Sequence, residues 1–283
     1  MSVFGDTELT ATKQAVISER VQRHLISESV LANTISDLSV FARKGAVSVS
    51  FPKGGDFTVE NRASGVAATN QVFNYAKDTM SLSNRATISW IVDPMDEIES
   101  VVAVQQDLIG RATRGHAKDV DVKIIAELET VGVATTTVSP SITDAVILEM
   151  RAAILRNKAD RRRLRMAVAP EQESDILGIT KFVSAQDYGG GAVVPSGALG
   201  MIYGMPVLIT PEIAAGTYYM YEEAGCGIAF QRAPMLDSRK APEYGAGAQL
   251  FTLDQKYGVK GLQLGEQGVL ATESALVIKD NNI

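Results

Sequence analysis

The sequence predicts an α+β fold, in which strands precede and follow one long helix along the chain. Three observations carry this prediction. A stretch near residue 50 alternates apolar and polar residues with a period of two, which is typical of a strand. A helical pattern then runs from 94 to 131. The C-terminal third contains short apolar segments separated by glycine-rich turns, which predict the remaining strands.

Length and composition limit the classes of protein that this chain can be. Its 283 residues allow one or two domains, and a hydrophobic content of 46% is enough for a sizeable core. The net charge of -6 argues against a protein whose main task is gripping nucleic acid, although not against one that encloses it. One cysteine excludes an internal disulfide. Because no apolar run approaches the ~20 residues of a membrane span, we expect a soluble chain made in a cytoplasm.

The alternating stretch begins a long, bent hairpin. Val47, Val49 and Phe51 alternate with serines, and the Pro and Gly residues that follow bend the strand. The segments 71–77 (QVFNYAK) and 86–92 (ATISWIV) predict the return strands. Hairpin arms of about 15 residues, at ~3.3 Å per residue, reach on the order of 50 Å. In the last segment one face is apolar: Ile88, Trp90 and Val92.

The long helix has a clear beginning and end. Asp93 is a good N-cap, Pro94 suits the first helical position, and Gly132 ends the helix. At 1.5 Å per residue it would be about 57 Å long. One side carries a mixed, mostly apolar stripe: Ile98, Val102, Gln105, Ile109, Ala112, His116, Val120, Ile124 and Leu128.

Shorter elements follow this helix. The pattern predicts a second helix over 142–157, a buried strand over 164–170 and a short acidic helix over 170–177. Residues 186–200 form a glycine-rich loop. Within 199–213, Gly204 and Met205 are expected to form a turn between two short strands, the second of which begins at Pro206.

No pattern of catalytic, cofactor-binding or metal-binding residues emerges. The two histidines, His24 and His116, each stand alone on an expected helix, and a GxSxG nucleophile motif is absent. The glycine motifs at 225–230 and 245–250 lack the third glycine of a dinucleotide fingerprint. We therefore expect no cofactor, no metal and no enzyme activity.

Two charged clusters have structural interpretations. The acidic residues of 93–99 suit the start of a helix, where the helix dipole favours negative charge. The arginine string of 161–165 suits a helix C-terminus and a solvated or inter-subunit face better than a nucleic-acid site.

The order of these elements resembles a tailed-bacteriophage major capsid protein of the Hong Kong 97-type fold. The segments that carry the resemblance are VSVSFPKGGDFTVE with QVFNYAK, DPMDEIES to IIAELETVG, LRMAVAPEQESDIL, LGMIYGMPVLITPEI and QLFTLDQKYGVKGLQ. The resemblance implies five parts: an N-terminal arm (1–40), an extended E-loop (41–80), the first part of a peripheral domain with its spine helix (81–137), an axial domain (138–228) and the returning peripheral strands (229–283).

The resemblance also implies a function. Copies of a major capsid protein self-assemble into pentamers and hexamers, which form an icosahedral shell around double-stranded DNA. Separate scaffold and portal proteins are the expected partners, DNA is enclosed without sequence-specific binding, and no membrane is involved. Because the E-loop pattern begins near residue 45, we expect no fused scaffolding segment. The expected location is the virion, after assembly in the cytoplasm of a bacterial host.

In such a shell the E-loop lies across a neighbouring copy, and the N-terminal arm ties adjacent copies together. The residues expected at these contacts are Val49, Phe51, Lys53, Asp56, Phe57, Arg62, Val72 and Phe73 from the loop, and Arg20 and Arg23 from the arm.

Two alternatives remain open. An encapsulin-type nanocompartment shell has the same fold and encloses a protein cargo. A cytoplasmic enzyme of another class would use the glycine-rich loop at 186–200 as a lid.

Overall fold

A computed structural model describes residues 29–43, 45–53, 59–72, 76–93, 104–134, 141–157, 159–179, 200–245, 247–261 and 277–281. Helices and strands both contribute substantially, as the predicted α+β class requires. The chain divides into two compact units, each assembled from separate stretches. Unit 1 comprises Met1–Val47, Leu82–Ile125 and Ile228–Val259, and unit 2 comprises Ser48–Ser81, Ala126–Gly227 and Lys260–Ile283. The five-part division expected from the sequence stays a prediction.

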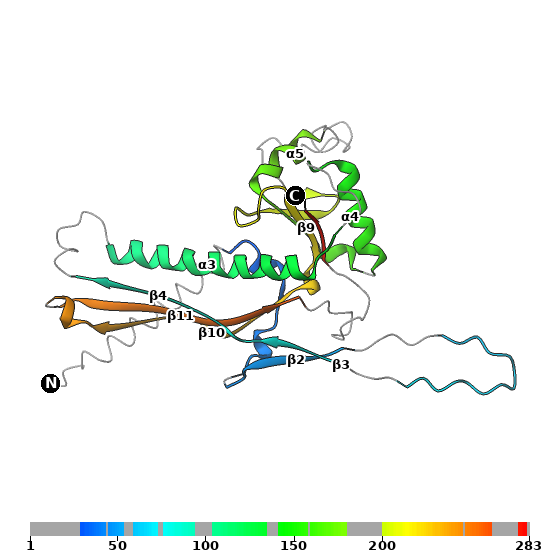
Figure 1. The fold of residues 1–283 in the computed structure, drawn as a ribbon, viewed down its shortest axis with the longest axis horizontal. Coiled ribbons are helices and arrows are strands. Elements are labelled where there is room, and N and C mark those ends of the chain that lie inside the picture. Colours follow the sequence, from blue (N-terminus) through cyan, green and yellow to red (C-terminus); the bar gives the residue numbers. More distant parts are fainter. Residues whose placement is uncertain are drawn as a thin grey trace, which may run out of the picture. The chain divides into compact units, whose positions relative to one another are not determined.

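Unit 1 contains a four-stranded sheet. Its order is β1 (Ser36–Asp37), β10 (Gly227–Lys240), β11 (Gln249–Lys260) and β4 (Asn84–Val92). Strand β4 runs antiparallel to β11, from Asn84 opposite Tyr257 to Val92 opposite Gln249. The long helix α3 (Val104–Val131) runs along this sheet (Figure 1).

The face of β4 predicted to be apolar packs inward. Ile88, Trp90 and Val92 belong to a cluster with residues of β11 and α3, whereas Ser89 and Ile91 between them are exposed. The Trp90 ring stacks on its cross-strand partner Phe251, with centroids 5.7 Å apart. Such aromatic pairs add stability beyond the area that they bury. The period-two prediction for this strand is confirmed.

The apolar stripe of α3 is confirmed where the structure describes it. The buried members are Ala112, His116, Val120, Ile124 and Leu128. The helix ends at Val131, and the Gly132 amide still donates to the Leu128 carbonyl at 2.8 Å. Gly115 lies where an added Cβ would be 3.1 Å from Ile88 Cδ1, so a small residue permits this close packing. The predicted helix start at 94 lies outside the described residues.

A buried carboxylate fixes the chain just before β1. Asp121 of α3 is 4% exposed and accepts hydrogen bonds from the Ser29 hydroxyl at 2.6 Å and from the Val30 and Leu31 amides at 3.0 and 3.2 Å. Hydrogen bonds to a charged acceptor are stronger than neutral ones. The N-terminal arm expected over 1–40 lies mostly outside the described residues.

A separate two-stranded sheet corrects part of the predicted hairpin. Strand β2 (Ser48–Lys53) pairs antiparallel with β3 (Ala76–Ser81). The segment 86–92 was expected to return along the same hairpin but pairs with β11 instead. Val47 also departs from the alternation, since it is 75% exposed and precedes β2, after a turn that contains Gly45 at φ 88.

Unit 2 contains a six-stranded mixed sheet. Its order is β5 (Val133–Ala134), β12 (Val277–Asn281), β9 (Thr217–Glu222), β6 (Leu164–Val168), β8 (Met205–Ile209) and β7 (Met201–Ile202). The helices α4 (Asp144–Arg156) and α5 (Glu173–Gly178) confirm the second helix and the short acidic helix, and β6 is the predicted buried strand. Short 3-10 turns complete the two units: η1 (Ala32–Thr34), η2 (Ser39–Phe41), η3 (Arg161–Arg163), η4 (Pro170–Gln172), η5 (Glu223–Gly225) and η6 (Pro242–Tyr244).

A tight turn at Tyr203 and Gly204, within 199–213, connects β7 to β8. Tyr203 and Gly204 have φ values of 49 and 77, and both lie in the left-handed region that suits a two-residue hairpin turn. Pro206, the second residue of β8, pairs with Met201. The predicted pair of short strands is confirmed. Among the described residues, none of the helices has the length and apolarity to cross a bilayer.

The packing of α3 predicts a pH dependence. Burial lowers the pKa of His116, although its bond to the Leu253 carbonyl and the nearby Asp119 and Asp254 carboxylates oppose this. The unfolded chain therefore binds the proton first, and stability falls as the pH drops through the ordinary histidine range near 6.5. We expect a lower thermal midpoint at about pH 5.5 than at about pH 7.5.

The variant His116→Gln keeps an amide donor for Leu253 and removes the titration. It should lose less stability than the wild type over the same pH interval, as measured by thermal unfolding. Equal losses in both proteins would contradict the assignment to His116.

Candidate inter-subunit surface

The β2–β3 hairpin has one apolar and one polar side at its base. Val49 and Met80 are directly opposite each other, and they are 6% and 0% exposed. Phe51 is also buried, at 8%. Across the exposed side the Ser50 and Thr79 hydroxyls lie 3.5 Å apart. Because a two-stranded sheet is marginally stable alone, this buried side is what holds the base of the hairpin.

The loop between the two strands is exposed along its described length. Every residue from 59 to 72 is exposed, including Val59 at 89% and Val72 at 84%. Local hydrogen bonds nevertheless give the loop a shape. Glu60 accepts from the Thr69 amide at 3.0 Å, and the Arg62 guanidinium donates to the Val66 carbonyl at 2.5 Å. The loop thus presents apolar side chains that its own chain leaves uncovered.

A lysine from β11 anchors the base of this hairpin within unit 2. The Lys260 ammonium forms an ion pair with the Asp78 carboxylate and donates to the Thr79 carbonyl at 2.8 Å. Both charged side chains are about one-third exposed, at 30% and 29%. The adjacent Gly261 amide lies 3.3 Å from a carboxylate oxygen of Glu127 on α3. No local pattern indicated these contacts, because their partners are distant in the sequence.

The structure places the expected contact residues unevenly. Val49 and Phe51 are already covered within the chain, so little of either is left for a neighbour. Arg62 and Val72 are exposed on the loop. Lys53 belongs to β2, but its side chain is outside the described part. Outside the described residues lie Asp56, Phe57, Phe73, Arg20 and Arg23. The role of all ten residues in inter-subunit contacts stays a prediction.

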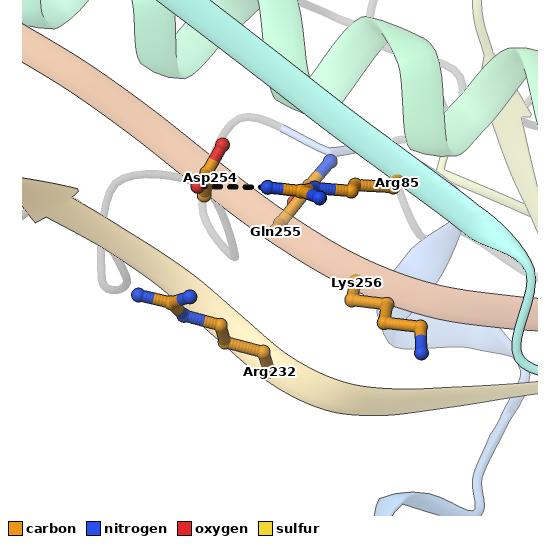
Figure 2. A pocket seen from close by; sticks show the side chains of 5 residues that line it. All are labelled: Arg85, Arg232, Asp254, Gln255 and Lys256. Atoms are coloured by element: carbon orange, nitrogen blue, oxygen red, sulfur yellow. Dashed lines mark ion pairs between the residues drawn. The ribbon is translucent and has the colours of Figure 1, made fainter. Parts of the chain in front are cut away.

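A hollow of about 300 Å³ lies on the sheet of unit 1, and charged or polar residues line it. Figure 2 shows Arg85, Arg232 and Lys256 around it, with the Asp254 carboxylate 3.7 Å from the Arg85 guanidinium. Asp254 also accepts from the Thr87 hydroxyl at 2.6 Å. Its carboxylate is therefore satisfied by neighbours, and the side chains that line the hollow include no Ser, Thr, Cys or His.

The strongly shifted ionisable groups have structural causes. Burial raises the pKa of the Cys226 thiol to about 12. Burial also raises the pKa of Tyr219 and of Tyr257, whose hydroxyls donate to Glu129 at 2.8 Å and to Asp119 at 2.6 Å. Within the described parts of the chain, the acidic, His and Cys side chains form no group of three or more that could hold a metal ion.

Comparison with known proteins finds likeness in structure alone. Neither a protein-family profile nor a curated protein sequence matches the chain. A structure from Mycobacterium phage Che8 aligns with a TM-score of 0.72 at 18% identity, over 90% of this chain and 91% of that one. A subunit of the mature capsid of bacteriophage PhiM1 aligns with 0.64 at 12% identity, over 89% and 86%. The virus-like particle from Pyrococcus furiosus aligns with 0.59 at 9% identity, over 93% and 98%.

These alignments span nearly the whole of each chain, so the likeness concerns the complete architecture. The chain has the fold of phage capsid proteins. The resemblance to tailed-phage major capsid proteins that the sequence suggested is confirmed at the level of the fold.

The anchor of the hairpin can be tested by removing its charge. In Lys260→Met the Asp78 carboxylate and the Thr79 carbonyl lose their partner, so the base of the hairpin should open more often. We expect faster amide hydrogen exchange in β2 and β3, with a loss of about 1 kcal/mol or less in global stability, because the ion pair is partly exposed.

Lys256→Met is the matched control, since Lys256 lies on the same strand and has no ion pair within the described residues. Exchange in the hairpin should stay at the wild-type rate in this control. Equal acceleration in both variants would show that the Lys260 contact does not anchor the hairpin.

Proposed function

We propose that this chain is a major capsid subunit, whose copies assemble into pentamers and hexamers of an icosahedral shell around double-stranded DNA. The fold shared with phage capsid structures supports this proposal. The acidic balance of the chain, with a net charge of -6, suits a wall that encloses DNA without binding its sequence. Separate scaffold and portal proteins belong to the proposal, as do assembly in a bacterial cytoplasm and the absence of enzyme activity.

The single observation that carries the proposal is the exposed loop of residues 59–72. Its valines, Val59, Val66 and Val72, are 89%, 55% and 84% exposed. Apolar surface that the chain itself does not cover is typical of a contact with another molecule. In the proposed shell this loop lies on a neighbouring copy, and many such modest contacts add up around the particle.

A protein nanocompartment is the nearest alternative. The likeness to the Pyrococcus furiosus virus-like particle keeps this alternative open, although its TM-score of 0.59 is below the 0.72 of the phage Che8 structure. The nucleic acid or protein content of purified particles separates the two. The enzyme alternative rests on a lid at 186–200, of which only residue 200 is described.

Shortening the loop tests its proposed role. Replacing residues 59–72 by a short Gly-Ser turn should leave the thermal midpoint and helix content of the subunit near the wild-type values, because the loop residues are exposed. Shells should no longer form, as measured by negative-stain microscopy and light scattering.

A less drastic variant separates apolar contact from loop length. Val59→Ser, Val66→Ser and Val72→Ser together should raise the protein concentration needed for assembly, whereas Val122→Ser on α3, at a position 39% exposed, should alter it less. Normal shells from the shortened protein would refute the proposed role of the loop.

A further inference from the structure

The central strand of unit 2 separates two regions of opposite charge. Strand β6 lies between β9 and β8, and its five residues span about 15 Å. Apart from Arg165, all its side chains are fully buried. The two ends of β6 are therefore fixed at opposite sides of a rigid sheet.

The beginning of β6 is rich in arginine. Arg161 to Arg163 form η3 directly before the strand, and α4 ends nearby at Arg156. The arginines of this end are Arg156, Arg161, Arg162, Arg163 and Arg165, and the acidic residues are Asp160, Glu222 and Glu223.

Some of these arginines are neutralised within the chain and others are not. Arg165 lies 3.8 Å from Glu223, and Arg163 lies 4.0 Å from Asp160. Glu222 is buried, at 7% exposed, and this burial raises the pKa of its carboxyl. Arg161 and Arg162 are exposed and have no ion pair within the described residues. The arginine end thus has a surplus of positive charge on its surface.

The other end of β6 is acidic. The Thr210 amide donates to the Val168 carbonyl at 3.2 Å, and the Ile142 amide donates to Asp175 at 3.2 Å, so three segments meet there. Their acidic residues are Asp144, Glu171, Glu173, Asp175 and Glu212. The segments 141–144, 169–179 and 210–217 contain no Lys or Arg. Glu171 is exposed and Glu173 is partly exposed.

We propose that the arginine end of β6 in one copy docks against the acidic end of β6 in the next copy, head to tail around a ring. This inference rests on the proposed capsid function and names the contact that forms the pentamers and hexamers. Both partners are present on every chain, which a head-to-tail contact requires. Complementary charge fixes the register of such a contact and guides its formation.

A nucleic acid is the less favoured occupant of the arginine end. The chain as a whole carries a net charge of -6, and three acidic residues accompany the arginines. A phosphate backbone would meet this negative charge, whereas the acidic end of a second copy offers carboxylates to the exposed Arg161 and Arg162. When a second copy is the partner, every copy in a closed ring makes the same two charged contacts.

Charge reversal at each end tests the contact. The first variant is Arg161→Glu with Arg162→Glu, and the second is Glu171→Arg with Glu173→Arg. A third chain carries all four substitutions. Circular dichroism and thermal unfolding check that each variant folds, and negative-stain microscopy with native mass spectrometry counts the copies in each ring.

Each single-end variant should fail to close rings, because positions 161 and 162 then carry the same charge as positions 171 and 173. The chain with all four substitutions should form rings again, because the charges at these positions are complementary in the opposite sense. An equimolar mixture of the two single-end variants can satisfy its contacts only by alternation, so it should form six-membered but not five-membered rings.

A milder variant covers the case in which a reversal prevents folding. Arg161→Gln with Arg162→Gln should raise the concentration needed for assembly about tenfold, since each lost surface ion pair contributes up to about 1 kcal/mol. It should also make assembly less sensitive to salt.

The outcomes separate this inference from the proposed function. Wild-type shells together with normal rings from either single-end variant would overturn the head-to-tail contact alone, as would failure of the folded four-substitution chain to assemble. A folded wild-type protein that forms no ring or shell would instead overturn the proposed capsid function.

Discussion

The central constraint on this chain is that its hairpin has too little apolar surface of its own. Two strands, β2 and β3, form a sheet that is buried at its base through Val49, Phe51 and Met80, while the loop beyond them is exposed. An isolated two-stranded sheet is marginal in water. The polar contacts of Lys260 with β3 secure the base of the hairpin, but they leave the loop without apolar cover. In the proposed shell, the missing cover comes from a second copy.

Periodic patterns in the sequence predicted the elements better than their partners. The buried stripe from Ala112 to Leu128 and the apolar face of β4 follow directly from periods of 3.6 and two residues. The pairing of β4 with β11 was not predicted, because an apolar alternation fits any sheet with one buried face. Polar contacts between residues distant in the sequence are even harder to predict. Asp121 and the 29–31 segment, like Lys260 and Asp78, lie far apart in sequence, and the residues around them carry no motif that indicates the contact.

The sequence also showed the charged residues without showing how they are arranged in space. The arginine string of 161–165 and the acids of 170–177 were both visible in the sequence, and each has a local explanation in helix electrostatics. Their relation depends on β6, which holds them at opposite ends of one buried strand. A rigid strand with opposite charges at its ends gives each copy a direction. In the proposed contact, the arginine end of one copy meets the acidic end of the next, which generates a ring. The loops between helices and strands can accommodate rings of five or six copies.

The hydrogen bonds inside the exposed loop have a kinetic consequence. Glu60 with Thr69 and Arg62 with Val66 restrict the backbone before any neighbour arrives. The loop therefore loses part of its conformational entropy when the subunit folds. Each docking event then has a smaller entropic cost. A preorganised segment forms its encounter complex without a slow search among disordered conformers. Particle growth would then be limited by collisions between subunits and not by rearrangement of the loop.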